Sequence, residues 1–141
     1  MIPLQRLHDW PVRLDRIITS ARDVPFKWGE FDCALFVCAC IKAMTDVDPG
    51  AKYLRTYSDE PGAIRIYGGD LAAFTANIAA ELGMPEVGVT FARRGDVVFL
   101  DNGTEHGCIG IVGLDGRFAA CASDGIVLVR MHRWKRCWMV G

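Results

Sequence analysis

An almost uninterrupted apolar run extends from Cys33 to Met44 and contains a single charged residue, Lys42. Asp32 stands immediately before it, and Asp is among the residues that best cap the start of a helix. Because a helix that is apolar on all sides must be buried, the run predicts a central helix with Asp32 as its N-cap. The run is much shorter than the ~18 apolar residues that indicate a membrane span, so we expect no membrane span.

The rest of the N-terminal half carries helix signals, whereas the C-terminal half carries strand signals. Pro, Asp and Gly at helix-start and helix-stop positions predict three more helices: 11–22 with Asp9 or Trp10 as cap, a short one before Gly68 and Gly69, and one from the Asp70 cap to Leu82, ended by Gly83. Apolar and β-branched residues separated by turn signals predict an antiparallel meander: 97–100, 108–112, 117–122 and 126–131, with 134–140 as a last strand or edge.

Helices followed by strands predict an α+β fold, in which the buried central helix packs on a C-terminal antiparallel sheet. The 141 residues, 51% hydrophobic and without a linker or repeat, predict one domain over 1–141.

Sixteen basic and seventeen acidic residues leave a net charge of −1, which argues against nucleic acid as a partner. No secretory signal is visible in residues 1–13, so we expect the protein to stay in the cytoplasm where it is made.

Six cysteines are too few for a disulfide scaffold, and we expect them to be thiols. Cys38 and Cys40 lie two residues apart in the predicted helix, where they point to different faces, so we interpret both as core residues. Cys33 is different, because it opens the helix. Unpaired N–H groups and the positive end of the helix dipole favour a thiolate there. Cys33 is thus a candidate nucleophile, although a buried Cys at a helix start is more often structural.

The residues around Cys33 form a recognisable block: Phe26, Trp28-Gly29, Asp32-Cys33 and Phe36. This block resembles the NlpC-like branch of the papain-fold cysteine peptidases, in which the nucleophile follows an aromatic-Gly-x-x-Asp sequence and opens the central helix. Residues 94–99, Arg-Gly-Asp-Val-Val-Phe, are similar to the Gly-Asp-apolar strand of that family. The resemblance implies a papain-like NlpC-type fold, and it implies that the strand 108–112 is the one that carries the base.

A phage-associated subfamily encoded among tail genes resembles the chain almost from end to end. The shared positions are Asp9-Trp10-Pro11, the Trp28–Cys33 block, Ala43-Met44-Thr45, Asp48-Pro49, Arg55, Tyr57, Gly95–Val98 and Trp138. This resemblance implies a domain that is made in the bacterial cytoplasm and then assembled into the virion tail, with other tail-tip proteins as partners. Relatives in that gene position are linked to tail assembly and to cutting peptidoglycan peptides.

The chain departs from the peptidase pattern at the position of the catalytic base. A cysteine peptidase needs an imidazole beside its thiolate, but Cys108 occupies the place of the family's His, and the third polar position falls near Ala120 or Cys121. His106 is the best substitute: if the strand extends that far, its side chain and that of Cys108 share one face. The alternative is that His106 is exposed in a turn. We interpret His8 and His132 as surface or structural residues.

Three interpretations of function therefore stay open. The first is a structural or assembly protein of the phage tail with a degenerate site, which docks through Trp134, Trp138 and the basic cluster Arg130, His132, Arg133, Lys135 and Arg136 unless that cluster is merely solvated. The second is an active cell-wall cysteine endopeptidase or amidase that uses Cys33 with His106, with Asp32 as helix cap. The third is a zinc or iron–sulfur site at Cys33, Cys108 and Cys121, with His106 as a possible fourth ligand. The alternative for these thiols is that they only fill apolar space. A domain with no connection to phage tails is the remaining class.

Overall fold

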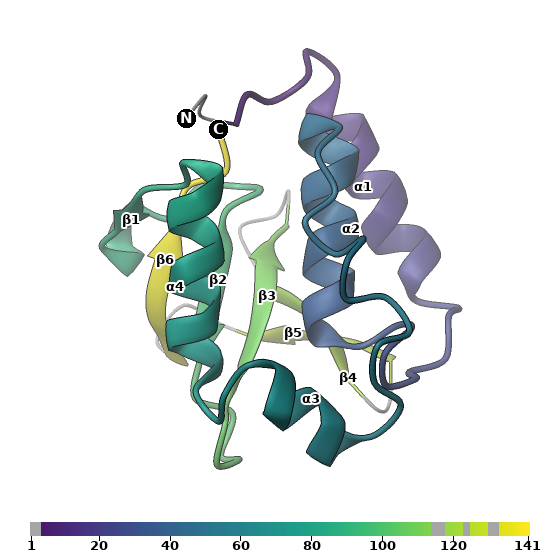
Figure 1. Ribbon diagram of the computed structural model, residues 1–141. Coiled ribbons are helices and arrows are strands. Elements are labelled where there is room, and N and C mark those ends of the chain that lie inside the picture. The colour runs from purple at the N-terminus through teal and green to yellow at the C-terminus, as the bar shows by residue number, and fades with distance from the viewer. Residues whose placement is uncertain (1–3, 114–117, 123–124, 130–132) are drawn as a thin grey trace.

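The computed structural model describes residues 4–113, 118–122, 125–129 and 133–141, with the main chain alone for 118–122 and 125–129. In this part of the chain four α-helices precede an antiparallel sheet, so the α+β class is confirmed (Figure 1). The helices are α1 (Trp10–Ala21), α2 (Cys33–Thr45), α3 (Glu60–Ile66) and α4 (Leu71–Leu82). No helix in these described ranges is long and apolar enough to cross a membrane.

The helix ends follow the local signals in the sequence. The side chain of Asp32 accepts a hydrogen bond from the Leu35 amide, and the side chain of Asp70 accepts one from Ala73, so both predicted N-caps are confirmed. Gly83 ends α4 with a φ of 71°, a left-handed conformation that glycine adopts without strain. Asp9 precedes α1 but makes no capping bond with its side chain.

Across the described ranges the sheet has six strands in the order β1-β6-β2-β3-β4-β5, and every pair is antiparallel. The strands are β1 (Glu86–Val87), β2 (Val97–Leu100), β3 (Cys108–Val112), β4 (Phe118–Ala122), β5 (Gly125–Val129) and β6 (Trp134–Trp138). The predicted meander is confirmed as β2 to β5. The C-terminal strand exists, but it does not form an edge: β6 lies between β2 and β1, a short strand that the sequence did not predict.

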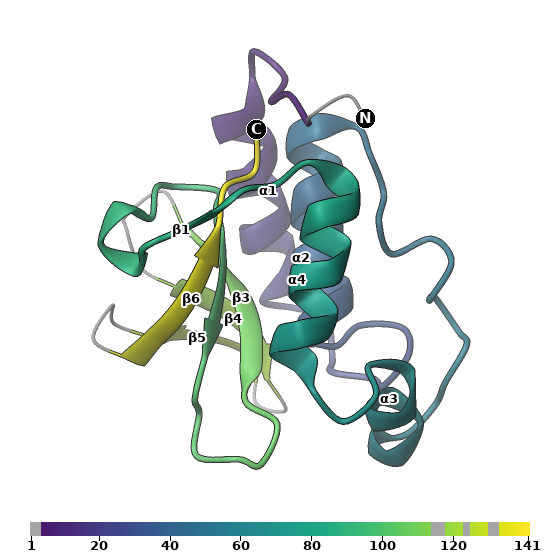
Figure 2. The same cartoon turned by 60° about the vertical axis from the view of Figure 1, so that its left-hand side comes forward.

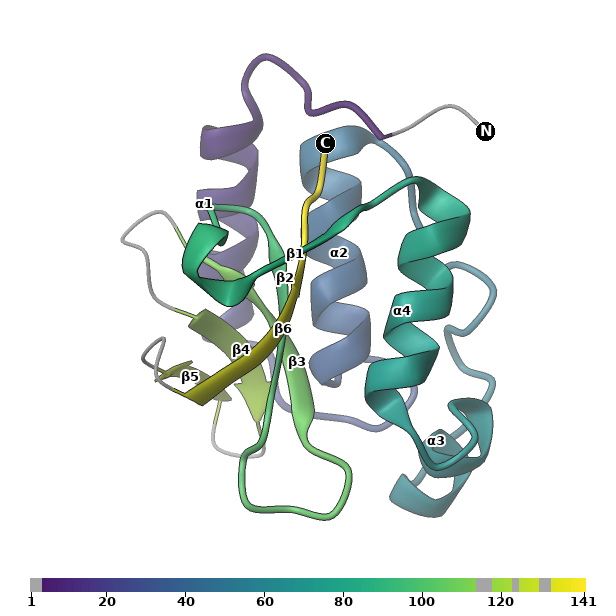
Figure 3. The ribbon, with the colours of Figure 1, turned by 90° about the vertical axis from the view of Figure 1, so that its left-hand side faces the viewer.

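The core lies between α2 and the sheet, with α1 on one flank of α2 and α4 on the other (Figures 2 and 3). Phe36 of α2 and Val97 of β2 are 0% and 1% exposed, so both belong to this helix-on-sheet core. A second cluster covers the other face of the sheet and contains Val98, Leu100 and Trp134. The core thus fixes α2 with its first residue close to β3.

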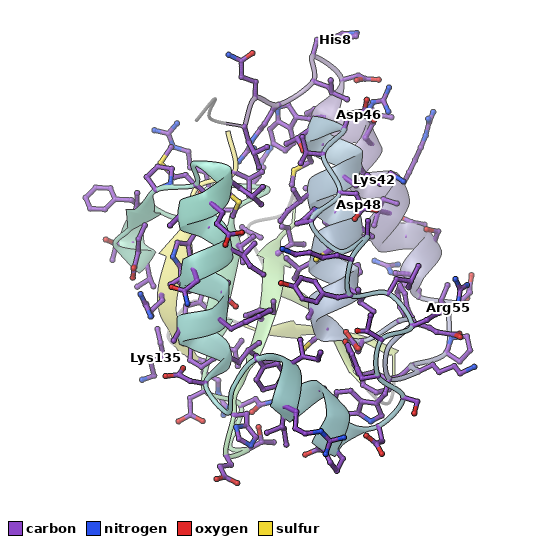
Figure 4. All side chains as sticks on the ribbon, in the orientation of Figure 1. His8, Lys42, Asp46, Asp48, Arg55 and Lys135 are labelled. Atoms are coloured by element: carbon purple, nitrogen blue, oxygen red, sulfur yellow. The ribbon has the colours of Figure 1, made fainter. Side chains whose placement is uncertain are left out.

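The prediction that Trp134 and Trp138 form a docking surface near the C-terminus is wrong. Trp134 and Trp138 are 4% and 1% exposed, because β6 is an inner strand and places them in the two core clusters. Arg136 is occupied by a bidentate ion pair with Glu86 at 2.7 and 2.9 Å. Arg133 and Lys135 are exposed, and Lys135 is labelled in Figure 4. Arg130 and His132 lie outside the described residues.

A buried carboxylate fastens both ends of the chain to the sheet. Asp96, which is 1% exposed and precedes β2, accepts a hydrogen bond from Arg6 at 2.8 Å, from the amide of Arg93 at 2.9 Å and from the amide of Val140 at 3.2 Å. Arg6 also donates to the carbonyl of Arg94 at 2.6 Å. The Gly95-Asp96 block that resembles the peptidase family therefore has a structural role of its own here.

Candidate functional site

The block before α2 folds into a tight hairpin that is docked on a distant loop. Lys27 and Phe31 pair through their main chains, which places Gly29 at the turn with a φ of 79°. The carbonyl of Gly29 accepts the amide of Arg55 at 2.7 Å. A Cβ atom on Gly29 would stand 1.8 Å from the carbonyl oxygen of Tyr57. Only glycine allows this approach, and the approach is what brings residues 55–57 beside the start of α2.

Asp32 connects the hairpin, the helix and that loop. It is 1% exposed. Its Oδ1 accepts the amide of Leu35 at 3.0 Å, and its Oδ2 accepts the amide of Gly29 at 3.0 Å together with the hydroxyl of Tyr57. Both carboxylate oxygens are therefore committed to structural hydrogen bonds. The predicted role of Asp32 as helix cap is confirmed, and its bond with Tyr57 extends that role.

Replacing this carboxylate should cost more than an ordinary helix cap. We expect Asp32→Ala to lower the free energy of unfolding by about 2–3 kcal/mol, because it removes the cap and leaves the buried amide of Gly29 and the half-buried hydroxyl of Tyr57 without a partner. The measurement is urea unfolding followed by circular dichroism.

Two companion variants separate the contributions to this loss. Tyr57→Phe removes one bond of the three and should cost about 1–2 kcal/mol. Asp70→Ala removes the exposed cap of α4 and should cost about 0.5–1 kcal/mol. If Asp32→Ala loses no more free energy of unfolding than Asp70→Ala does, the connecting role of Asp32 is contradicted.

Cys33 is the first residue of α2, as predicted, and its sulfur lies against the start of β3. Burial raises the pKa of the Cys33 thiol to about 11; the main chain of Ile109 offsets part of this shift, whereas the charge of Asp32 adds to it. The helix start does not overcome burial here. At pH 7 a thiol with a pKa of about 11 is ionised in only about one molecule in ten thousand.

Cys108 begins β3 and is an electrostatic neighbour of Cys33. Burial, followed by the charge of Cys33, raises the pKa of Cys108 to about 12. Its side chain nevertheless packs with the cluster on the other face of the sheet, while Cys33 packs with the core on the helix side. The side chain of Cys121 lies outside the described residues. Within the described residues no group of three His, Cys, Asp or Glu side chains is placed to hold a metal ion.

His106 lies in the loop before β3, because the strand begins at Cys108. The condition under which His106 and Cys108 were expected to share one face is therefore not met. Its Nδ1 lies 3.2 Å from the carbonyl oxygen of Gly69, and its Nε2 lies 3.8 Å from a carboxylate oxygen of Glu105. The side chain is 18% exposed, so it is not a freely exposed turn residue either. Among the described residues no imidazole is within hydrogen-bond reach of Cys33.

Tyr67 is a neighbour of both Cys33 and His106. Its ring is 6.1 Å from the ring of His106, in an edge-on arrangement. Burial and the charge of Cys33 raise the pKa of the Tyr67 hydroxyl to about 12, so this group is not a base near neutral pH. His8 is exposed and lies at the same end of the molecule as Asp46, the C-cap of α2, far from the first residue of that helix (Figure 4). His132 is outside the described residues.

A cavity of about 110 Å³ adjoins Cys33. Besides Cys33 and Cys38, aromatic side chains line it: Trp28, Tyr53, Tyr57, Tyr67 and Phe74. Trp28 and Tyr57 belong to the motifs noted in the sequence, but Tyr53, Tyr67 and Phe74 do not, since nothing in their local pattern distinguishes them from core residues. The surroundings of Cys33 are thus apolar and aromatic.

The comparison with known protein families gives a match. Residues 5–140 match the family described as a domain of unknown function, DUF6950. A search of the curated proteins finds no match. Because the match covers nearly the whole chain, including the hairpin, α2 and all the strands, the chain belongs to the DUF6950 family.

Proposed function

We propose that this protein is a papain-like domain of the NlpC type whose cysteine-peptidase site is degenerate, and that it serves as a structural or assembly component of a phage tail. The observation that carries the proposal is the state of Cys33. Its thiol has a pKa of about 11, and none of the described imidazoles is in reach. The domain then acts by binding other tail proteins and not by hydrolysis.

The placement of Cys33 supports the papain-like part of the proposal. A thiol at the first position of a buried helix, beside the first residues of an antiparallel strand, is the arrangement that the sequence resemblance implies. Here α2 begins at Cys33, packs on the sheet, and has the start of β3 next to its sulfur.

The residues beside Cys33 support the proposal that the site is not catalytic. A peptidase thiol is held as a thiolate by an adjacent imidazolium, which then protonates the leaving amine. Cys108 stands at the start of β3, and a thiol with a pKa of about 12 neither supports an ion pair nor delivers a proton at neutral pH. For His106 to serve as the base, it would have to leave the carbonyl of Gly69.

Hydrolysis of cell-wall peptides tests the non-catalytic part. Purified protein is incubated with muropeptides alongside Cys33→Ala and, as a matched control, Cys38→Ala, which removes a second thiol of the same helix and cavity. We expect all three proteins to release product at the rate of the buffer blank. Turnover by the wild type and by Cys38→Ala that Cys33→Ala lacks would show an active peptidase and overturn the proposal.

Co-expression tests the tail part. The protein is produced with the products of the genes that flank its own, and complexes are separated by size-exclusion chromatography. We expect a stoichiometric complex with at least one tail protein, formed equally by the Cys33→Ala variant because the thiol has no part in docking. A protein that elutes alone in every combination contradicts a tail-assembly role.

A further inference from the structure

A second pocket, of about 630 Å³, lies at the opposite end of α2 from Cys33. Its lining includes Arg6, Trp10, Arg93, Arg94, Asp96 and Trp134; we call it the arginine pocket. The amide of Leu7 bonds to the carbonyl of Met44 near the end of α2, which places the N-terminal segment at this end (Figure 1). Its volume is in the range of small-molecule sites, which is roughly 300–1,000 Å³.

The charges of the arginine pocket do not balance. Three arginine residues line the pocket together with a single acidic residue, Asp96. This carboxylate is already committed, because it accepts Arg6 and the amides of Arg93 and Val140. Among the described residues, the side chains of Arg93 and Arg94 have no ion pair or hydrogen bond. The pocket therefore keeps two positive charges that its own acidic residue does not neutralise.

Arg6 forms the fixed part of the pocket. Its guanidinium donates to Asp96, to the carbonyl of Arg94 and to the carbonyl of Val140, and it lies 4.2 Å above the ring centre of Trp10. Burial lowers the pKa of Arg6, and the neighbouring charge of Arg93 lowers it further, against the opposing effect of Asp96. An added negative charge would relieve that repulsion, so the site is arranged for an anion.

The walls of the pocket are apolar. Trp134 and Val112 are 4% and 2% exposed and come from the face of the sheet away from α2, while Trp10 comes from the start of α1. Indole and aliphatic walls favour a flat apolar body, and two unpaired guanidinium groups favour carboxylate or phosphate oxygens.

We propose that the arginine pocket binds a small ligand in which a carboxylate or phosphate group is attached to a planar apolar ring. Arg93 and Arg94 bind the oxyanion, and the tryptophan side of the pocket contacts the ring. This site is separate from that of Cys33, and it does not depend on whether the domain belongs to a tail.

Isothermal titration calorimetry tests the proposal with four probes: benzoate, phenyl phosphate, inorganic phosphate and benzylamine. We expect saturable binding of benzoate or phenyl phosphate, and whichever binds more tightly identifies the headgroup. Inorganic phosphate should bind at least about tenfold more weakly than phenyl phosphate because it lacks the ring. Benzylamine has the ring with a positive charge and should not bind.

The variant Arg93→Gln/Arg94→Gln should weaken binding of the better aromatic anion by at least about tenfold, since it removes two charge-assisted contacts. Both side chains are exposed, so the fold should be kept. Arg16→Gln/Arg22→Gln removes the same charge from exposed positions on and just after α1 and should bind as the wild type does. The proposal is overturned if neither aromatic anion binds, if benzylamine or inorganic phosphate binds as well as they do, or if the two double variants behave alike.

Discussion

The variant Gly29→Ala should lose about 3–5 kcal/mol of its free energy of unfolding, which is enough to unfold a marginally stable domain. Two costs combine at this position. The φ of 79° is unfavourable for any residue with a Cβ, and the new Cβ would stand 1.8 Å from the carbonyl oxygen of Tyr57, which belongs to the main chain and cannot rotate away. The hairpin and the loop 55–57 would have to separate.

Gly69→Ala is the matched control. Gly69 has nearly the same φ, 76°, but nothing lies within 4 Å of the position that a Cβ would take. This variant therefore measures the backbone cost alone, about 1 kcal/mol. Urea unfolding of both variants gives the difference, which is the cost of the close approach. Equal losses would mean that the hairpin does not press against Tyr57.

Asp96→Ala is expected to cost about 3–5 kcal/mol, because it leaves the largely buried Arg6 charge without its carboxylate partner and the amides of Arg93 and Val140 without their acceptor. Burial raises the pKa of Asp96 in spite of Arg6, so the ion pair itself adds little net stability. The loss comes from the partners left unpaired.

A double-mutant cycle distinguishes these two sources of the loss. Arg6→Ala combined with Asp96→Ala should cost less than the sum of the single variants by about 1–3 kcal/mol, as expected for groups in one network. Arg13→Ala, which removes the exposed Arg13–Asp9 pair, should cost less than about 1 kcal/mol. Additive losses for Arg6 and Asp96 would show that the two side chains do not act together.

Features with a local cause were predictable from the sequence. The start of α2 at Cys33, its Asp32 cap and the Gly83 terminator of α4 each depend on residues within a few positions of one another. The meander from β2 to β5 was predictable for the same reason, because only a few residues separate each strand from the next one along the chain.

Features that depend on distant pairing were not predictable. Nothing near Trp134 indicates that β6 returns to pair with β2, yet this pairing buries both tryptophans of that strand. The bond between Tyr57 and Asp32 joins positions 25 apart, and Tyr67 lines the same cavity as Cys33 although it lies beyond α3 in the chain. The local sequence also did not indicate whether β3 extends back to His106, and the strand begins at Cys108.

The pH dependence of Cys33 alkylation tests the central claim most directly. Protein is treated briefly with iodoacetamide from pH 5 to pH 11, and modification at Cys33 is quantified by fragment mass spectrometry. A thiol with a pKa of about 11 should react slowly at neutral pH and keep accelerating up to the top of this range. Rapid alkylation with an inflection below about pH 7 would reveal a thiolate paired with an imidazolium, and would contradict a non-catalytic Cys33.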